Sequence, residues 1–130
     1  MTIKLTTVYV DDQEKALRFY TDVLGFQKKA DFTQGDYRWL TVAAPEDPDG
    51  VELILESTAN PAGKAFQEAV RSQDRPAAQF LVDDVQADHE RMKTRGAEFT
   101  MPPTDVTGSR IAMLKDSCGN LIQVTQLMRW

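Results

Sequence analysis

The triplet Val-Asp-Asp occurs twice in the chain, at residues 10–12 and 82–84. Each copy follows a short apolar run and opens a stretch whose apolar residues fall at helical spacing. Further along, an acidic turn motif at residues 47–50 precedes one apolar run, and a similar motif at 116–119 precedes another. Motifs that recur in the same order at similar spacing indicate a duplicated unit. We therefore expect two equivalent modules.

The first copy has the pattern of a strand, a helix and three further strands. Residues 3–10 alternate between two faces, which predicts a strand. Asp11 and Asp12 are good N-cap residues, and Glu14, three residues after Asp11, completes a signal like a capping box. The helix should end at Gly25. Three more strands are expected at residues 26–32, 37–44 and 51–56.

The second copy repeats this order. Residues 77–82 predict a strand, and a helix that starts at Asp83 should end before Gly96. Three further strands, with Pro102-Pro103 after the first of them, are expected at residues 97–101, 110–115 and 121–126. The polar residues 58–76 are the least patterned and are interpreted as a linker, within which residues 64–70 could form a short helix.

Each half therefore has the order βαβββ, which leaves one face of its sheet without a helix. A module of this size buries little surface alone, so two modules are expected to share a core. The predicted fold is a single α+β domain over residues 1–130. Modules 1–57 and 77–130, joined by the linker 58–76, would form a curved mixed sheet around a cleft, with the helices outside.

The composition limits the partners of the chain. A formal net charge of -5 and a pI near 4.8 supply no basic surface for nucleic acid. No apolar run approaches the roughly 20 residues that cross a bilayer, so we expect no membrane span. Cys118 is the only cysteine, which excludes an intrachain disulfide and favours a cytoplasmic protein.

Short motifs extend over nearly the whole chain, at Val10 to Asp12, Lys15 to Leu17, Phe19-Tyr20, Leu24 to Phe26, Asp47 to Leu53, Lys115-Asp116 and Gly119 to Ile122. Their order and spacing resemble the vicinal oxygen chelate superfamily, which includes glyoxalase I, extradiol dioxygenases, fosfomycin-modifying enzymes and bleomycin-binding proteins. The resemblance implies paired modules, a small organic ligand in the cleft and a homodimer. It does not select a reaction, because the members share a scaffold and differ in chemistry.

The resemblance also implies where a metal would bind in members of the glyoxalase type. A ligand on the first strand, usually His, precedes the helix-capping Asp by seven residues, which gives Leu5 and Ala77. A ligand on the fourth strand, usually Glu, gives Glu52 and Gln123. Because Leu5 and Ala77 donate nothing to a metal, we expect no metal and no other cofactor. A divalent metal held by an atypical set of ligands is the alternative.

Glu52 is the leading candidate for chemistry. A carboxylate in a largely apolar cleft can act as a general base or hold a cationic group. Alternatively, it is a solvated carboxylate or is bonded to Gln79 or Gln123. These two amides occupy inward positions, so they either bond to each other and to Glu52 or orient a ligand.

The other predicted ligand-binding residues occupy inward positions of the first and fourth strands, at Leu5, Thr7, Tyr9, Ile54 and Ala77. On the third strand, either Arg38 or Trp39 must face the cleft because neighbouring residues alternate. We favour Arg38, which leaves Trp39 to pack in the interior.

His89 and Cys118 are not assigned to the site. His89 shares a helical stripe with Val85 and Met92, which should pack on the outer face of the sheet. Cys118 lies in a turn, where Lys115 is the only neighbouring cation, so we expect no lowered thiol pKa.

Two functions remain open. The first is a binding module similar to the bleomycin-resistance proteins, with an acidic cleft that favours a cationic ligand. The second is a glyoxalase-type lyase or isomerase, or a dioxygenase-like metalloenzyme with an atypical ligand set. We favour the first, and no motif identifies the ligand.

Overall fold

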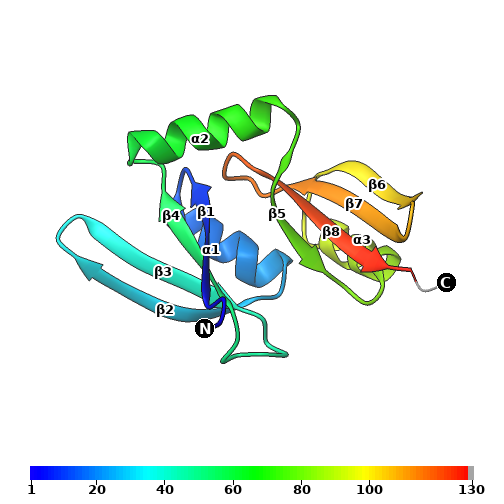
Figure 1. The fold of residues 1–130 in the computed structure, drawn as a ribbon, viewed down its shortest axis with the longest axis horizontal. Coiled ribbons are helices and arrows are strands. Elements are labelled where there is room, and N and C mark those ends of the chain that lie inside the picture. The colour runs from blue at the N-terminus through cyan, green and yellow to red at the C-terminus, as the bar shows by residue number, and fades with distance from the viewer. Residues whose placement is uncertain (129–130) are drawn as a thin grey trace. The chain divides into compact units, whose positions relative to one another are not determined.

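A computed structural model describes residues 1–128 of the chain (Figure 1). The chain divides into two compact units, Met1–Phe66 and Gln67–Trp130, and each is described by itself. The boundary falls inside a helix, in the part of the sequence that we interpret as a linker. Among the described residues, no helix is long and apolar enough to cross a membrane.

Unit 1 begins with the predicted order of strand, helix and three strands. Its sheet has the order β1-β4-β3-β2, in which β1 and β4 are parallel and the other pairs are antiparallel. The elements are β1 (Leu5–Val10), α1 (Gln13–Arg18), the π-helical turn η1 (Phe19–Val23), β2 (Gln27–Gln34), β3 (Tyr37–Ala43), β4 (Glu52–Ser57) and α2 (Pro61–Ser72), which continues into unit 2.

Unit 2 repeats the order of unit 1. Its sheet has the order β5-β8-β7-β6, again with one parallel pair, β5 and β8. The elements are β5 (Pro76–Leu81), α3 (Val85–Thr94), β6 (Phe99–Val106), β7 (Ser109–Lys115) and β8 (Leu121–Leu127). The prediction of two α+β modules with the order βαβββ is confirmed.

The two Val-Asp-Asp triplets start equivalent helices. The carboxylates of Asp12 and Asp84 accept hydrogen bonds from the backbone N–H groups of Lys15 and Ala87, at 3.0 and 3.1 Å. The bond from the Lys15 amide lowers the pKa of Asp12. The N-cap is therefore the second Asp of each triplet. The capping box predicted from Asp11 is wrong, because Asp11 lies outside the helix.

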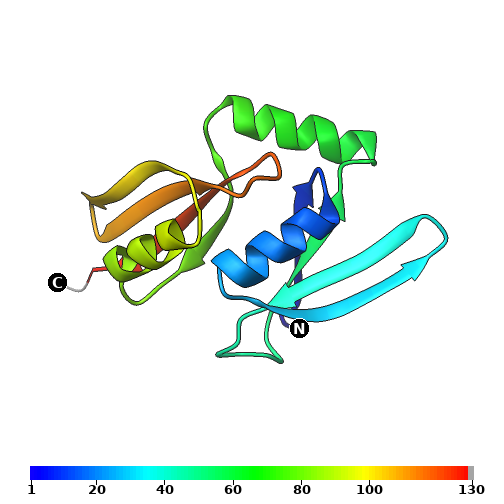
Figure 2. The same cartoon turned by 180° about the vertical axis from the view of Figure 1, so that it is seen from behind.

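One face of each sheet packs against its own helix. In unit 1, alternation turns Val8, Leu40 and Leu55 towards α1, and all three are buried. In unit 2, Leu114 and Ile122 are buried, and α3 covers one face of that sheet (Figure 2). Because these apolar residues face the helices, their neighbours along each strand lie on the opposite face of the sheet.

Two segments differ from the expectation. The prolines at 102 and 103 do not end a strand, because β6 runs from Phe99 to Val106 through them. They are tolerated there because β6 is an edge strand with an irregular register, so the missing N–H groups cost no ladder bond. The helix α2 is longer than expected: Pro61 is its first residue, a position where proline fits, and the Asn60 side chain accepts from Ala62 N–H at 3.0 Å.

Candidate functional site

The far face of unit 1 is the side of its sheet that is turned away from α1. Because Val8, Leu40 and Leu55 point towards α1, alternation places their neighbours on the far face. Leu5 pairs with Glu52 and Thr7 pairs with Ile54 in the parallel register of β1 and β4. These four predicted ligand-binding residues therefore share one face, and their contact with a ligand stays a prediction.

The carboxylate of Glu52 already has two partners within unit 1. The Thr41 hydroxyl donates to its Oε1 at 2.7 Å, and the Lys4 ammonium lies 3.6 Å from its Oε2. Lys4 Nζ also donates to the carbonyl oxygens of Asp49 and Gly50, at 2.8 and 2.7 Å. Glu52 is thus held by a neutral donor and by a cation of its own unit.

Tyr9 packs against α2. Its ring makes an edge contact with Phe66, with 6.2 Å between the centroids. A Cβ added at Gly63 would lie 2.5 Å from the Tyr9 ring, so the helix can approach only because residue 63 is glycine. The ring therefore packs against α2, and its contact with a ligand stays a prediction.

Arg38 does not lie on the far face, and that prediction is wrong. Its guanidinium bonds to Glu14 of α1 at 2.9 Å and to both carboxylate oxygens of Asp31 at 2.9 and 2.8 Å. The bond from Arg38 lowers the pKa of Asp31. Two carboxylates on the α1 side fix the orientation of Arg38, and alternation then turns Trp39 to the far face.

Three aromatic side chains lie on the far face, two of them exposed and Trp39 half-buried, and we call them the aromatic group: Phe32, Tyr37 and Trp39. The rings of Phe32 and Trp39 are stacked, with centroids 6.3 Å apart and planes inclined by 27°. Phe32 is 60% exposed and Tyr37 is 40% exposed. In the sequence, alternation along β3 already places Tyr37, Trp39 and Thr41 on one face. It does not say whether that face is the far face or the one turned towards α1.

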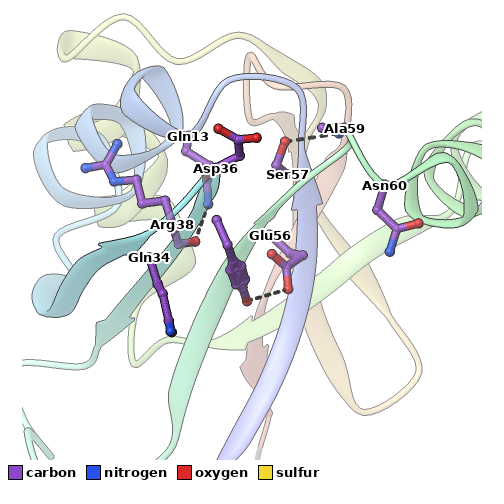
Figure 3. A pocket seen from close by; sticks show the side chains of 9 residues that line it. Gln13, Gln34, Asp36, Arg38, Glu56, Ser57, Ala59 and Asn60 are labelled. Atoms are coloured by element: carbon purple, nitrogen blue, oxygen red, sulfur yellow. Dashed lines mark hydrogen bonds between the residues drawn. The ribbon is translucent and has the colours of Figure 1, made fainter.

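Next to the aromatic group lies a hollow of about 540 Å³ (Figure 3). It forms where β3 begins and β4 ends, beside the first residue of α1. Its lining residues are Gln13, Gln34, Asp36, Tyr37, Arg38, Glu56, Ser57, Ala59 and Asn60. Of these lining residues, Arg38 alone was among the ligand-binding residues predicted from the sequence.

Tyr37 and Glu56 meet in the hollow. The Tyr37 hydroxyl donates to Glu56 Oε2 at 3.0 Å. Burial raises the pKa of Tyr37, and the bond to the Glu56 carboxylate raises it further, so the phenol stays neutral. Gln13 fixes the rim, because its amide donates to the carbonyl oxygens of Arg38 and Leu55 at 3.1 and 2.8 Å.

In unit 2, the two predicted amides bond to each other. Gln123 donates to Gln79 Oε1 at 3.2 Å and lies 3.1 Å from the Thr125 hydroxyl. This is the mutual bond that one of the two interpretations of the pair included, and that interpretation as a whole stays a prediction. Ala77 is exposed on β5, two residues before Gln79. Whether any of these residues touches a ligand stays a prediction.

His89 and Cys118 lie in the interior of unit 2, as expected. His89 is 8% exposed and its ring meets Phe99 edge-on, with 4.4 Å between the centroids. Its Nδ1 is buried and has no hydrogen-bond partner among residues 1–128. Cys118 is a buried free thiol. Neither is an exposed reactive group.

The four positions that the resemblance assigns to a metal do not fit one. Leu5 and Ala77 offer no donor atom, Glu52 is bonded to Thr41 and Lys4, and the amide of Gln123 is bonded to Gln79. Within residues 1–128, no three His, Cys, Asp or Glu side chains gather so that they could hold a metal ion.

Known proteins resemble this chain over almost its whole length. Residues 2–124 match the family described as Glyoxalase/Bleomycin resistance protein/Dioxygenase superfamily. The chain is 45% identical to the uncharacterized protein YurT of Bacillus subtilis (strain 168) over 126 residues, which are 97% of this chain and 99% of YurT.

Two solved structures have a similar fold. The crystal structure of UcmS2 has a TM-score of 0.84 and 27% identity, covering 96% of this chain and 97% of UcmS2. The crystal structure of TnmS3, an antibiotic binding protein from Streptomyces sp. CB03234, has a TM-score of 0.78 and 29% identity. That match covers 98% of this chain and 97% of TnmS3.

Proposed function

The chain belongs to the Glyoxalase/Bleomycin resistance protein/Dioxygenase superfamily, and we propose that it is a binding protein for a small planar organic molecule. The ligand lies on the far face of unit 1, with its ring system against the aromatic group. The observation that carries this proposal is the stacking of Phe32, which is exposed, on Trp39, which is half-buried.

The chemistry of the far face supports a planar ligand. Large aromatic side chains are normally buried, and a stacked pair that is partly open to solvent offers a flat apolar surface on which another ring can stack. Thr41 and Tyr37, on either side of Trp39 along β3, bond to the carboxylates of Glu52 and Glu56. A ring on Trp39 therefore lies between two acidic groups, which favours a ligand of low electron density or positive charge.

The comparisons and the charge of the chain agree with this proposal. TnmS3, which is 29% identical to this chain, is described as an antibiotic binding protein. By analogy, we propose that this chain sequesters a compound of similar size, without a chemical step and without a metal at Leu5, Glu52, Ala77 and Gln123. The net charge of -5 favours encounter with cations.

Two further parts of the proposal rest on the family alone. The chain forms a homodimer, which sedimentation velocity would show as a mass of twice 14.6 kDa. A glyoxalase-type lyase or isomerase is the competing function, and it requires a base on the far face. Glu52 is the candidate base, but its bonds to Lys4 and Thr41 favour a structural role.

The proposal is tested by calorimetric titration with 2-(1-naphthyl)ethanol, a neutral compound with one planar ring system. We expect Trp39→Leu to weaken binding by roughly tenfold, because the variant loses the stacking surface. Phe66→Leu is the matched control, since Phe66 is also half exposed but lies on α2. Equal affinities of wild type and Trp39→Leu would contradict the proposed function.

A further inference from the structure

We infer that Glu56, and not Glu52, is the residue that holds the cationic group of the ligand, within the hollow of unit 1. This inference rests on the proposed function, because it concerns the same ligand. It names the ligand class more narrowly: a planar aromatic compound that carries an amine on a short arm.

The two glutamates form a natural comparison. Both lie on β4, four residues apart, and therefore on the same face of the sheet. The Glu52 carboxylate is neutralised by the Lys4 ammonium and bonded to the Thr41 hydroxyl. Lys4 in turn donates to two carbonyl oxygens, those of Asp49 and Gly50, besides its ion pair with Glu52. A ligand cation at Glu52 would have to displace this ammonium.

Glu56 has no such cation. Its hydrogen-bond partner is the neutral Tyr37 hydroxyl, at 3.0 Å. Among residues 1–128, no Lys, Arg or His nitrogen lies within ion-pair distance of Glu56 or of Asp36. The neighbouring guanidinium of Arg38 is bonded to Glu14 and Asp31 and is turned away from Glu56 (Figure 3). The hollow thus carries two carboxylates without a compensating charge.

The rest of the hollow suits an amine. The side-chain amides of Gln34 and Asn60 line the hollow with Glu56 and Asp36, and the Asn60 oxygen also accepts from the Ala62 amide. A protonated primary amine donates three hydrogen bonds and accepts none, which matches a lining rich in acceptors. The volume of about 540 Å³ lies in the range of pockets that bind small organic molecules, so the hollow can admit the arm as well as the nitrogen.

The distance between the stacking position at Trp39 and the hollow sets the length of the arm that joins the ring system to the amine. Tyr37 and Trp39 are two residues apart on β3, which is about 7 Å along a strand. Tyr37 lines the hollow, while Trp39 stacks with Phe32. A ring system on Trp39 therefore reaches Glu56 with an arm of two or three atoms that ends in an amine.

A pair of matched probes tests this inference. The amine 2-(1-naphthyl)ethylamine and the alcohol 2-(1-naphthyl)ethanol differ in charge but share the ring and the arm. Calorimetric titration of wild type should show a preference for the amine of roughly tenfold. Glu56→Gln should abolish the preference. Glu52→Gln should keep the preference.

Each other outcome has a definite meaning. Loss of the preference in Glu52→Gln, with retention in Glu56→Gln, would identify Glu52 as the anchor and overturn the inference. Retention in both variants would show that the hollow does not hold the amine. Alcohol binding that depends on Trp39, without a preference for the amine, would overturn the inference and leave the proposed function intact. Failure of both probes to bind would contradict both.

A second measurement does not depend on the folding of the variants. In the ¹H–¹⁵N spectrum of wild type, the shifts caused by the amine should differ from those caused by the alcohol mainly at residues 34–38 and 56–60. Differences confined to Lys4, Thr41 and Glu52 would contradict the inference.

Discussion

Thr41 joins three strands of unit 1 through one hydroxyl group. It is completely buried, donates to Glu52 Oε1 at 2.7 Å, and accepts from the Ala30 amide at 3.1 Å. The register of β2 and β3 shifts between Lys28 and Ala30, so this hydroxyl satisfies an amide at an irregularity of the ladder. The orientation of Glu52 is thus part of the structure of the sheet.

Removal of this hydroxyl should destabilise the protein. Thr41→Val keeps the shape of the side chain but leaves the Ala30 amide without the Thr41 acceptor and the Glu52 carboxylate without its hydrogen-bond donor, with Lys4 still beside it. We expect the free energy of unfolding to fall by about 1–3 kcal/mol, measured by urea denaturation. Thr33→Val, at an exposed position on the edge strand β2, is the control and should change stability by less than about 0.5 kcal/mol. Equal stability of Thr41→Val and wild type would show that the hydroxyl is not a structural link.

At the scale of elements, the N-caps of α1 and α3 make the two units equivalent. Asp12 and Asp84 have nearly the same extended backbone, with φ of -149° and -145°, and each caps the third amide after it. In α3, the side chain of Gln126 adds a second acceptor, for the Val85 amide at 2.9 Å. Unit 2 therefore holds the start of its helix with two side chains.

The cap at Asp12 predicts a pH dependence. The Lys15 amide lowers the pKa of Asp12 below its usual value of 3.8, so the cap stabilises the folded state fully above pH 3.8. That contribution is lost as the pH falls through the lowered folded-state pKa. Asp12→Asn keeps an accepting oxygen but does not titrate. We expect the difference in urea midpoint between wild type and Asp12→Asn to be constant near neutral pH and to change below pH 3.8.

The neighbouring residue supplies the control for this measurement. Asp11→Asn removes a carboxylate that lies 3.9 Å from the Lys15 ammonium but does not cap the helix. The same pH-dependent change in Asp11→Asn would show that general charge, and not the cap, causes the effect.

At the scale of the whole molecule, the repeat made the fold predictable. The spacing of the Val-Asp-Asp triplets and of the glycine turns is set by local backbone chemistry, which a sequence displays directly. Both βαβββ modules were therefore predicted. The boundaries at Pro102 and at Asn60 were misjudged, because tolerance of proline depends on whether a strand is at an edge and whether a helix begins there.

The site was less predictable because it depends on the orientation of one strand. Alternation alone allows either Arg38 or Trp39 on the far face, and both sequence patterns are equally regular. The partners of Arg38 decide which of the two residues lies on the far face. One of these partners, Glu14, lies 24 positions away in the sequence, so local patterns do not reveal it. The role of Lys4 at Glu52 was hidden in the same way, since it depends on the turn at residues 47–50.

Removal of metal ions tests whether this chain needs the metal that the family resemblance implies. The residues at the four implied positions do not fit a metal, so dialysis against EDTA should leave the affinity for 2-(1-naphthyl)ethylamine unchanged within about twofold. A large loss of affinity that added Zn²⁺ or Ni²⁺ restores would show that an atypical ligand set holds a functional metal.

The most direct test of the central claim is the position of the Trp39 indole N–H signal during titration with 2-(1-naphthyl)ethanol. If a planar ligand stacks on the aromatic group, this signal and the amide signals of β2 and β3 shift together and saturate at one ligand concentration. A Trp39 signal that stays in place while the compound binds elsewhere would contradict the account. So would the absence of any binding at millimolar concentrations of the compound.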